Sequence, residues 1–520
     1  EEQFSSYDQY SSFERRHIGP TSLQENQLLK ELGYSDLASF ISDVMPSNIA
    51  MTKKLSDALP LPLNEVQAIE SLREIAEKNL IFDSFIGCGY YGTITPPVVL
   101  RNVLENPAWY TAYTPYQPEI SQGRLEALFA FQTAVCDLTA LPIANASMLD
   151  EGTAAAEAMT LARRTYKGSD NAVFLIDQNV HPQTKAVIAT RAKPLNIEIE
   201  EFDSKQGIKT ESEYFAALVQ YPDTTGSVDD YSHIAEQIHA NNAFLIAATD
   251  LLSLTLLKPP GEWGADVAIG SAQRFGVPMG FGGPHAGFMA VQSGLERSMP
   301  GRLIGQSVDV HGNPAFRLAL QTREQHIRRD KATSNICTAQ VLLAVISAFY
   351  AMWHGPAGLK LIAQNIHNQT NSLAKSLKKK NYEVVNKSFF DTLTIKVPDA
   401  NKIHRDAFNN QINLRVIDSE HVGVSLDETT NHQSLLKLAQ VFGIEIIEEQ
   451  NSIGFDSSLK RESRYLQHPV FNINHSETAM LRYIRTLSDR DLALDRTMIP
   501  LGSCTMKLNA TTEMEAVTWP

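Results

Sequence analysis

One stretch of the chain has the residue types that surround a reactive lysine in many enzymes, but it contains no lysine. Residues 265–288 read ADVAIGSAQRFGVPMGFGGPHAGF, a short apolar strand with a small polar end followed by a glycine-rich turn. A lysine after such a strand would form an imine with the aldehyde of pyridoxal phosphate. Gln273 and Arg274 stand there instead, and the nearest lysines, Lys258 and Lys331, do not follow the strand. The stretch is either a pyridoxal phosphate site without its lysine or a plain hairpin between two sheet strands.

A second stretch, ANASMLDEGTAAAEAM, predicts an alanine-rich helix that opens at Gly152 and Thr153. Free backbone N–H groups at a helix N-terminus can hold the phosphate of a cofactor. Asp150 and Glu151 stand at this terminus, where carboxylates suit the helix dipole but repel a phosphate. We favour an acidic helix cap over a phosphate site. Both stretches then predict a domain shaped like a pyridoxal phosphate domain without a working cofactor site.

The stretch NPAWYTAYTPYQPEISQGR, residues 106–124, is unusual for a connecting loop. Its prolines stiffen the backbone, and its tyrosines supply rigid surface that is both apolar and polar. Tyr113 and Tyr116 are three residues apart and could face the same way, while Glu119 and Gln122 add polar side chains. We interpret the stretch as a functional loop, with aromatic packing between domains as the alternative.

Three other features allow a ligand without requiring one. His181 follows the predicted strand NAVFLID in a loop, where its ring could stack on a cofactor, although a lone loop histidine more often does not. Residues 323–331 are rich in Arg and Lys, which suits an anion clamp or a salt-bridged helix face. The stretch GCGYYG, residues 87–92, has the spacing of a dinucleotide fingerprint. Such a fingerprint needs a helix directly after it, and TITPP follows instead, which disfavours NAD.

The elements around these residues predict an α/β fold. Between residues 76 and 345 the predicted strands are NAVFLID, IEIEEFD, AFLIAATD, ADVAIGS and GFMAVQ, and helical patterns lie before the first and between the first three. Apolar strands that alternate with helices indicate a mostly parallel sheet covered on both faces. We therefore predict one large α/β domain over 76–345.

The rest of the chain predicts three further parts. Residues 1–75 predict a helical N-terminal arm, with helices in TSLQENQLLKELG and NEVQAIESLREIAEKN. Residues 346–450 begin with long helices and continue with YEVVN, DTLTIKV and EIIEEQ, which indicates a small α+β domain. Residues 451–520 begin with a polar linker and continue into what we interpret as the truncated start of another domain.

Composition narrows the function classes. The 520 residues carry a formal net charge of −14, which argues against nucleic acid and against an anionic membrane face. No apolar run reaches the roughly 18 residues of a membrane span. The four cysteines form no C-x-x-C pair, so we predict no zinc site of that type, no other metal motif appears, and a reducing compartment is expected. The first residues show no secretory signal, and because the chain begins with Glu we regard it as processed or as a fragment.

Several stretches together resemble the P-protein family of the glycine cleavage system, the decarboxylating glycine dehydrogenases. They span almost the whole chain in order: RRHIGP, YTAYTPYQPEISQG, NASMLDEGTAAAEA, LKPPGEWGAD, GVPMGFGGPHAGF, REQHIRRDKATSNICT and PLGSCTMKLN. The resemblance implies two related halves, each with a fold-type-I PLP-transferase core, in one long chain or in two subunits. It places the cofactor lysine in the second half, whose start PLGSCTMKLN resembles. It therefore implies that Gln273 takes the lysine position in a first half that lacks the lysine.

The same resemblance implies a reaction and partners. Pyridoxal phosphate would support decarboxylation of glycine, and the aminomethyl group would pass to the lipoyl arm of H-protein, with T-protein and L-protein in the same system. The active site would lie between the halves, which would form a homodimer or a paired-half assembly. Cytoplasm is the expected compartment, or the mitochondrial matrix in a eukaryote.

The resemblance also names candidate site residues. The first half would provide substrate contacts and a wall of the active site: Tyr113, Tyr116, Gln117, Glu119, Gln122 and His181. Ser503, Cys504 and Thr505 would lie near the cofactor. Two alternatives stay open: a non-enzymatic scaffold subunit with a pseudo-PLP fold, and an NAD-linked dehydrogenase that uses GCGYYG.

Overall fold

The chain forms two units in the computed structural model. One comprises Glu1–Ile81 with Leu508–Trp519, and the other comprises Phe82–Lys507. The structure describes residues 13–17, 19–51, 53, 55–112, 115–280, 282–320, 329, 340–448, 454–498 and 509–519.

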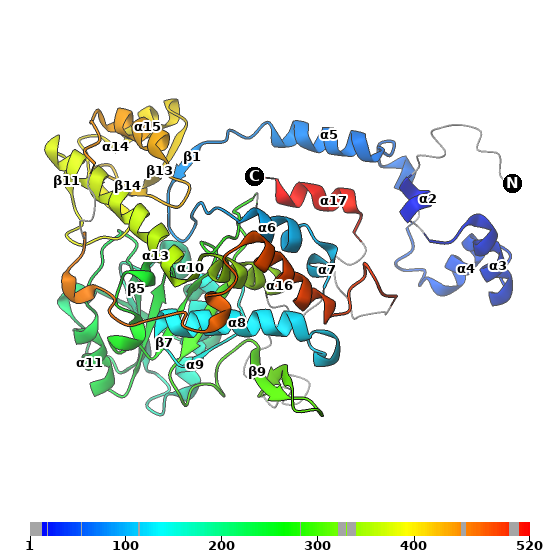
Figure 1. Cartoon of the computed structure of the whole chain (residues 1–520), viewed down its shortest axis with the longest axis horizontal. Coiled ribbons are helices and arrows are strands. Elements are labelled where there is room, and N and C mark those ends of the chain that lie inside the picture. Colours follow the sequence, from blue (N-terminus) through cyan, green and yellow to red (C-terminus); the bar gives the residue numbers. More distant parts are fainter. Residues whose placement is uncertain are drawn as a thin grey trace. The chain divides into compact units, whose positions relative to one another are not determined.

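A seven-stranded sheet forms the centre of the second unit (Figure 1). Its strand order is β2–β8–β7–β6–β5–β3–β4. The strands are β2 (Ile143–Ala144), β3 (Val173–Asp177), β4 (Ile199–Phe202), β5 (Tyr214–Tyr221), β6 (Phe244–Thr249), β7 (Val267–Ser271) and β8 (Gly287–Val291). Strands β3 to β7 pair in parallel, and β8 runs antiparallel to β7. The predicted α/β class and mostly parallel sheet are confirmed.

Helices cover both faces of this sheet, which explains why its strands are apolar on both sides. All eight residues of β5 are buried. Ala217 and Val219 face a core shared with α8 (Gln122–Thr139), α11 (Ser232–Ala240) and α13 (Val341–Lys379). Ala216 and Leu218 face a core shared with α9 (Glu151–Thr165) and α10 (Pro182–Ala192). Because successive side chains alternate between faces, one strand contributes to both cores.

A second, five-stranded sheet has the order β1–β13–β14–β12–β11. Its strands are β1 (Asp83–Phe85), β11 (Glu383–Val384), β12 (Thr392–Lys396), β13 (Ile412–Val416) and β14 (His421–Ser425), accompanied by α14 (Ala400–Asn409) and α15 (His432–Phe442). This small α+β part also takes in β1, which precedes the large sheet in the chain and pairs in parallel with β13. The described part of EIIEEQ, its first four residues 445–448, forms no strand.

The long helix α13 is bent at Gly355, which has a φ of 61° and is followed by Pro356. By length and composition α13 is the one helix of the described residues apolar enough to cross a membrane. Its most apolar window is 56% buried within the protein, and the helix packs against α8. These contacts identify α13 as a core helix of the second unit.

The first unit is helical, as the sequence predicts. It contains α2 (Phe13–His17), α3 (Ser22–Leu32), α4 (Leu37–Val44), α5 (Glu65–Ala76) and α17 (Thr511–Glu515). Thr21 and Gln24 form a capping box at the start of α3, and Gly33 ends the helix with a φ of 83°. Both ends of α3 are the cap types that the sequence indicates.

Residues 454–498 pack against the rest of the second unit, although we expected a linker at their start. Arg461 is 9% exposed, and its guanidinium donates to the carbonyls of Leu138 and Leu254 at 2.7 and 2.8 Å. Helix α16 (Glu477–Asp489) packs against α8, with Met480 and Leu487 fully buried (Figure 1). The described part of this segment is therefore bound to the unit formed by 82–507. That it opens a second homologous half stays a prediction.

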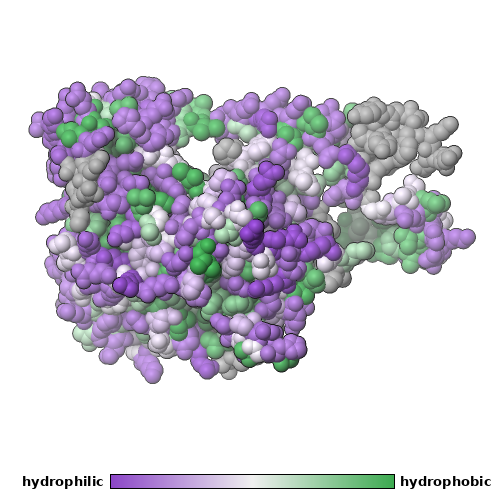
Figure 2. All heavy atoms as spheres, in the orientation of Figure 1, coloured by the Kyte–Doolittle hydropathy of each residue, from purple (hydrophilic) through white to green (hydrophobic). Residues whose placement is uncertain are grey.

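Short elements complete the unit: α6 (Pro97–Val99), α7 (Pro107–Tyr110), and the antiparallel hairpin of β9 (Leu303–Val308) and β10 (Pro314–Ala319). The face of the protein shown in Figure 2 is mostly hydrophilic, with scattered apolar side chains. Scattered apolar residues of this kind are ordinary on a folded surface.

Candidate functional site

A small polar cavity lies where several parallel strands end. Its wall includes Gln220 of β5, Thr249 and Asp250 at the end of β6, and Ser271 at the end of β7. The carboxyl ends of strands in a parallel sheet are the usual place for a ligand. The described residues that line it are Cys88, Gly89, Tyr91, Glu151, His181, Gln220, Pro222, Asp223, Thr224, Thr249, Asp250, Ser271, Gln273, Arg274, Asp391, Thr392 and Arg415, and they include no lysine.

Gln273 occupies the position after β7 where a cofactor lysine is expected, and its amide is fully engaged. The Nε2 group donates to the carbonyls of Tyr91 and Val277, both at 2.8 Å. The Oε1 atom accepts from the backbone N–H of Tyr91 at 3.1 Å. Gln273 is 1% exposed, and these hydrogen bonds tie the loop after β1 to the turn after β7. The strands β7 and β8 are antiparallel neighbours, so the turn 272–286 also joins two sheet strands, as the hairpin interpretation requires.

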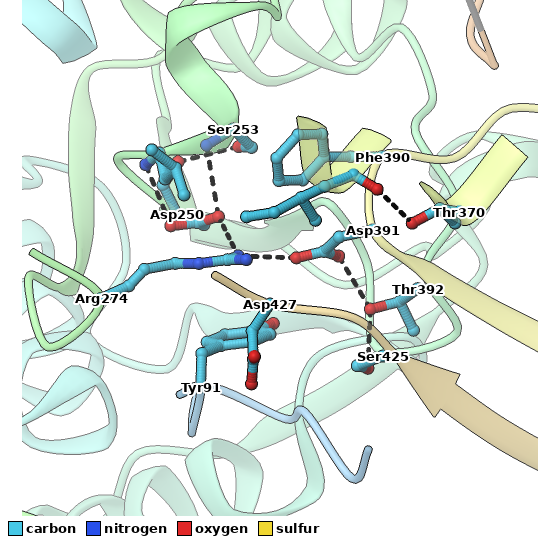
Figure 3. A network of polar contacts seen from close by, with 12 residues as sticks. Tyr91, Asp250, Ser253, Arg274, Thr370, Phe390, Asp391, Thr392, Ser425 and Asp427 are labelled. Atoms are coloured by element: carbon cyan, nitrogen blue, oxygen red, sulfur yellow. Dashed lines mark hydrogen bonds and ion pairs between the residues drawn. The ribbon is translucent and has the colours of Figure 1, made fainter. Parts of the chain in front are cut away.

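Arg274 lines the strand-end cavity, and Figure 3 shows its side chain between Asp250, Asp391 and Tyr91. Its Nη1 atom donates to a carboxylate oxygen of Asp250 at 2.7 Å and of Asp391 at 2.6 Å. Its guanidinium lies over the ring of Tyr91, 3.9 Å from the centroid. Burial disfavours the charged guanidinium, but Asp250 and Asp391 outweigh burial and raise the pKa of Arg274. A fixed cation therefore stands where the sequence suggested room for a cofactor.

The N-terminus of α9 is acidic, as the sequence predicts. The Asp150 carboxylate caps the helix by accepting from the Thr153 N–H at 2.7 Å. Glu151 accepts from the Thr184 hydroxyl at 2.9 Å and lines the cavity. Burial raises the pKa of Glu151 to about 7. The favoured interpretation of an acidic cap is confirmed at Asp150.

Glu151 makes the stability of the protein depend on pH. Its pKa in the folded protein, about 7, lies above the ordinary value of 4.5, because the buried carboxylate ionises with difficulty. The folded state is therefore fully stable with respect to this group below about pH 4.5, and it loses free energy of unfolding as the pH rises from there through about 7. Glu151→Gln retains an acceptor for Thr184 but cannot ionise. Relative to the wild type, we expect the variant to gain about 3 kcal/mol between pH 4.5 and pH 8.5. Urea unfolding of both proteins across this range measures the difference, and parallel stability curves would contradict the assignment.

His181 lies in the same cavity and is 6% exposed. Its Nδ1 atom is 3.0 Å from the Thr224 hydroxyl oxygen, and its backbone N–H donates to Gln220. Burial and the nearby Arg415 lower the pKa of His181 to about 3. His181 is therefore neutral at ordinary pH and lies among the polar residues of the strand-end cavity.

The tyrosine-rich stretch is anchored elsewhere, on the β9–β10 hairpin. Arg302, directly before β9, donates to the Tyr116 hydroxyl at 3.0 Å and lies 4.9 Å from the centroid of its ring. The Gln122 amide forms two hydrogen bonds with the backbone of Phe316 in β10, at 2.8 and 2.9 Å. Both ends of the segment 116–122 are thus fixed to the same hairpin.

Glu119 and Gln122 line a second, larger groove of about 920 Å³ between α8 and the β9–β10 hairpin. Glu119 and Gln117 are exposed. The structure therefore separates the predicted site residues into His181 in the strand-end cavity and Glu119 and Gln122 in the groove. Tyr113, Ser503, Cys504 and Thr505 lie outside the described residues, and of the cationic stretch 323–331 only Arg329 is described.

The geometry around GCGYYG does not support the dinucleotide alternative. The strand before it, β1, belongs to the smaller sheet, and the next helix, α6, begins only at Pro97. The loop contributes Cys88, Gly89 and Tyr91 to the strand-end cavity. A dinucleotide site would need a helix that starts directly at the glycines, so that its N-terminus could face the pyrophosphate.

The comparisons with known proteins identify the family. A family model described as glycine cleavage system P-protein matches residues 15–442. This chain belongs to that family. It is 54% identical over 518 residues to the glycine dehydrogenase (decarboxylating) of Cupriavidus metallidurans, covering 98% of this chain and 53% of that protein. The chain spans about half the length of the curated relatives that it matches.

A solved P-protein shares this fold. The inhibitor-bound crystal structure of a glycine decarboxylase (P-protein) of the glycine cleavage system superposes with a TM-score of 0.74 at 34% identity, over 82% of this chain and 98% of that one. A mutant of the C-DES protein with glycine covalently linked to its PLP cofactor matches with a TM-score of 0.50 at 12% identity, over 70% of this chain and 97% of that one. These matches confirm the fold-type-I PLP-transferase class.

The cavity of this P-protein chain does not fit pyridoxal phosphate. A water molecule needs roughly 10–15 Å³, and the cavity measures about 30 Å³. Arg274 lines it as an ion-paired cation, Asp150 and Glu151 occupy the helix terminus that would face a phosphate, and its described lining offers no amine for an imine. Each of these features opposes the cofactor independently.

The interactions of Arg274 with Asp250, Asp391 and Tyr91 were missed by the sequence analysis. Asp391 is 117 residues from Arg274 in the chain, and no local spacing links the two. The one available signal was an Arg directly after the strand end, next to Gln273, because a buried arginine requires acidic partners.

Proposed function

We propose that this chain is the supporting half of a glycine-decarboxylating P-protein, whose pyridoxal phosphate is held by residues outside the chain. The observation that carries the proposal is the small cavity after β7. Gln273 stands at the position expected for the lysine, and the ion-paired Arg274 lines the space expected for the cofactor. The relatives, named as decarboxylating glycine dehydrogenases and about twice as long, support an activity that needs a second part.

The proposed reaction removes CO2 from glycine and transfers the aminomethyl group to the lipoyl arm of H-protein. T-protein and L-protein would act in the same system, and the halves would associate as a homodimer or as paired halves. The proposed compartment is the cytoplasm, or the mitochondrial matrix in a eukaryote. Family membership and the names of the relatives support these proposals.

Within this half, we assign the tyrosine-rich stretch to the wall of the shared active site. The anchoring of Tyr116 by Arg302 and of Gln122 by Phe316 supports this role, because anchored side chains give a rigid surface. Gln117 and Glu119 would present polar groups from the same segment, together with Tyr113. His181 stays a proposed site residue, and it lies in the strand-end cavity and not on this stretch. Ser503, Cys504 and Thr505 keep their proposed place near the cofactor.

The test is the release of CO2 from carboxyl-labelled glycine with lipoylated H-protein. The chain alone is expected to release none, and the chain together with the second half of a P-protein is expected to be active. Tyr116→Phe removes the acceptor for Arg302, and a hydrogen bond to a charged group is worth about 1.5–3 kcal/mol. Because the proposed wall would lose this anchor and become less rigid, we expect kcat/KM of the assembled protein to fall by up to about tenfold.

Tyr166→Phe is the matched control, since it also removes one hydroxyl that bonds a charged group, Glu213 at 2.9 Å. It is expected to leave kcat/KM unchanged. Equal losses in both variants would contradict the role of the stretch. An assembled protein that folds but releases no CO2 would favour the non-enzymatic scaffold instead.

A further inference from the structure

We propose that the strand-end cavity is a binding site for a planar guanidinium, which the side chain of Arg274 occupies. By binding there, Arg274 holds the five-stranded sheet against the seven-stranded sheet. The inference concerns this chain alone and does not rest on the proposed function.

The first step is the position of the two carboxylates. Asp250 directly follows β6 of the large sheet, and Asp391 directly precedes β12 of the small sheet. One nitrogen atom, Nη1 of Arg274, donates to both (Figure 3). A single donor atom therefore joins the two sheets at the centre of the cavity.

Both carboxylates are held in place by further hydrogen bonds. Asp250 accepts from the backbone N–H groups of Leu252 and Ser253 at 3.0 and 3.2 Å. Asp391 accepts from the Thr392 hydroxyl at 2.8 Å, which in turn lies 2.8 Å from the Ser425 hydroxyl oxygen (Figure 3). The acidic partners are thus preorganised on each sheet, independently of the cation.

The third step is the shape of the cavity around the cation. The Tyr91 ring lies 3.9 Å and the Phe390 ring 5.6 Å from the guanidinium carbon. Nη2 of Arg274 and Oγ1 of Thr249 are buried and have no hydrogen-bond partner within the described part of the chain. Both residues line the cavity. Flat aromatic surface, two carboxylates and a spare acceptor form a site for a planar guanidinium rather than for a compact ammonium.

A second set of bonds ties the loop after β1 to the end of β14, next to the cavity. The Asp427 carboxylate, after β14, accepts from the Gly92 N–H at 2.6 Å. The Glu428 carboxylate accepts from the hydroxyls of Thr93 and Tyr350, at 2.9 and 2.8 Å. The Thr93 hydroxyl also donates to the Arg274 carbonyl at 3.0 Å, so loosening Arg274 is expected to affect the loop after β1 as well.

The test is chemical rescue of Arg274→Ala. We expect its Tm to fall by roughly 5 °C or more, because two buried carboxylates lose their partner. Millimolar N-ethylguanidinium chloride should restore most of that loss in a saturable way, whereas tetramethylammonium chloride at the same concentration should not. Neither salt should raise the Tm of the wild type.

Hydrogen exchange separates this role from general destabilisation. In Arg274→Ala, exchange should rise in peptides around Tyr91, Asp250 and Asp391 together and return with N-ethylguanidinium, while α16 stays unchanged. Arg274→Lys keeps the charge but not the planar fork, so it should show the same local rise in exchange. If the alanine variant fails to fold, the lysine variant is measured in its place. No selective rescue, or wild-type exchange in Arg274→Lys, would overturn the proposal.

Discussion

Replacing Arg124 by alanine is expected to destabilise the unit formed by residues 82–507 by about 3–5 kcal/mol. Arg124 Nε donates to Asp491 at 2.8 Å, and both side chains are 4% exposed. The Asp491 carboxylate also accepts from the backbone N–H of Gly123 at 2.7 Å, so it caps α8 from beyond the end of α16. Removing the guanidinium leaves this carboxylate buried with a weaker set of partners. Urea unfolding with tryptophan fluorescence measures the loss.

The matched control is Arg485→Ala, which breaks an ion pair with Asp489 on the exposed side of α16. The side chains of Arg485 and Asp489 are 74% and 49% exposed. The loss of free energy of unfolding in Arg485→Ala should therefore stay below about 1 kcal/mol. Equal effects of the two variants would show that residues 454–498 are not held to α8 by the buried pair.

Gln273→Lys is expected to destabilise the unit by about 3 kcal/mol or more and to leave pyridoxal phosphate unbound. The substitution removes an amide that makes three hydrogen bonds, to Tyr91 and Val277, and an ammonium offers no acceptor for the Tyr91 N–H. It also buries an ammonium next to Arg274, and the cavity has no room for a cofactor. A lysine at the right place therefore does not restore the site. Urea unfolding and the absorbance of added pyridoxal phosphate test both parts.

Gln433→Lys provides the control, since Gln433 is exposed on α15. It should change stability by less than about 0.5 kcal/mol. A Gln273→Lys protein as stable as this control, or one that forms a stoichiometric imine, would refute the conclusion that the cavity is closed.

Much of the fold follows from local patterns. Strands such as β3, β6 and β7 are short apolar runs between helical periods, and such runs are fixed by burial on both faces. The caps of α3 follow from Thr21 and Gly33 alone. The missing lysine and the acidic helix terminus at Asp150 were also visible, because each is a residue type at a defined place next to a predicted element.

The rest depends on contacts between residues far apart in the chain. Residues 454–464 are polar in sequence, yet Arg461 is buried because carbonyls of Leu138 and Leu254 converge on it. The strand β5 has buried tyrosines and a glutamine, so its burial is not evident from an apolar run. The roles of Arg274 and Gln273 required knowing that the loop after β1 and the start of β12 meet at the end of β7.

If the cofactor lysine lies outside this chain, as we propose, pyridoxal phosphate will not be trapped on any lysine within it. The chain is mixed with pyridoxal phosphate, reduced with borohydride and digested, and any pyridoxyl-lysine is mapped by mass spectrometry. The account predicts no stoichiometric label on any lysine. A single stoichiometric label, at Lys258 or Lys507 for instance, would contradict it and would show that this chain binds pyridoxal phosphate through a lysine of its own.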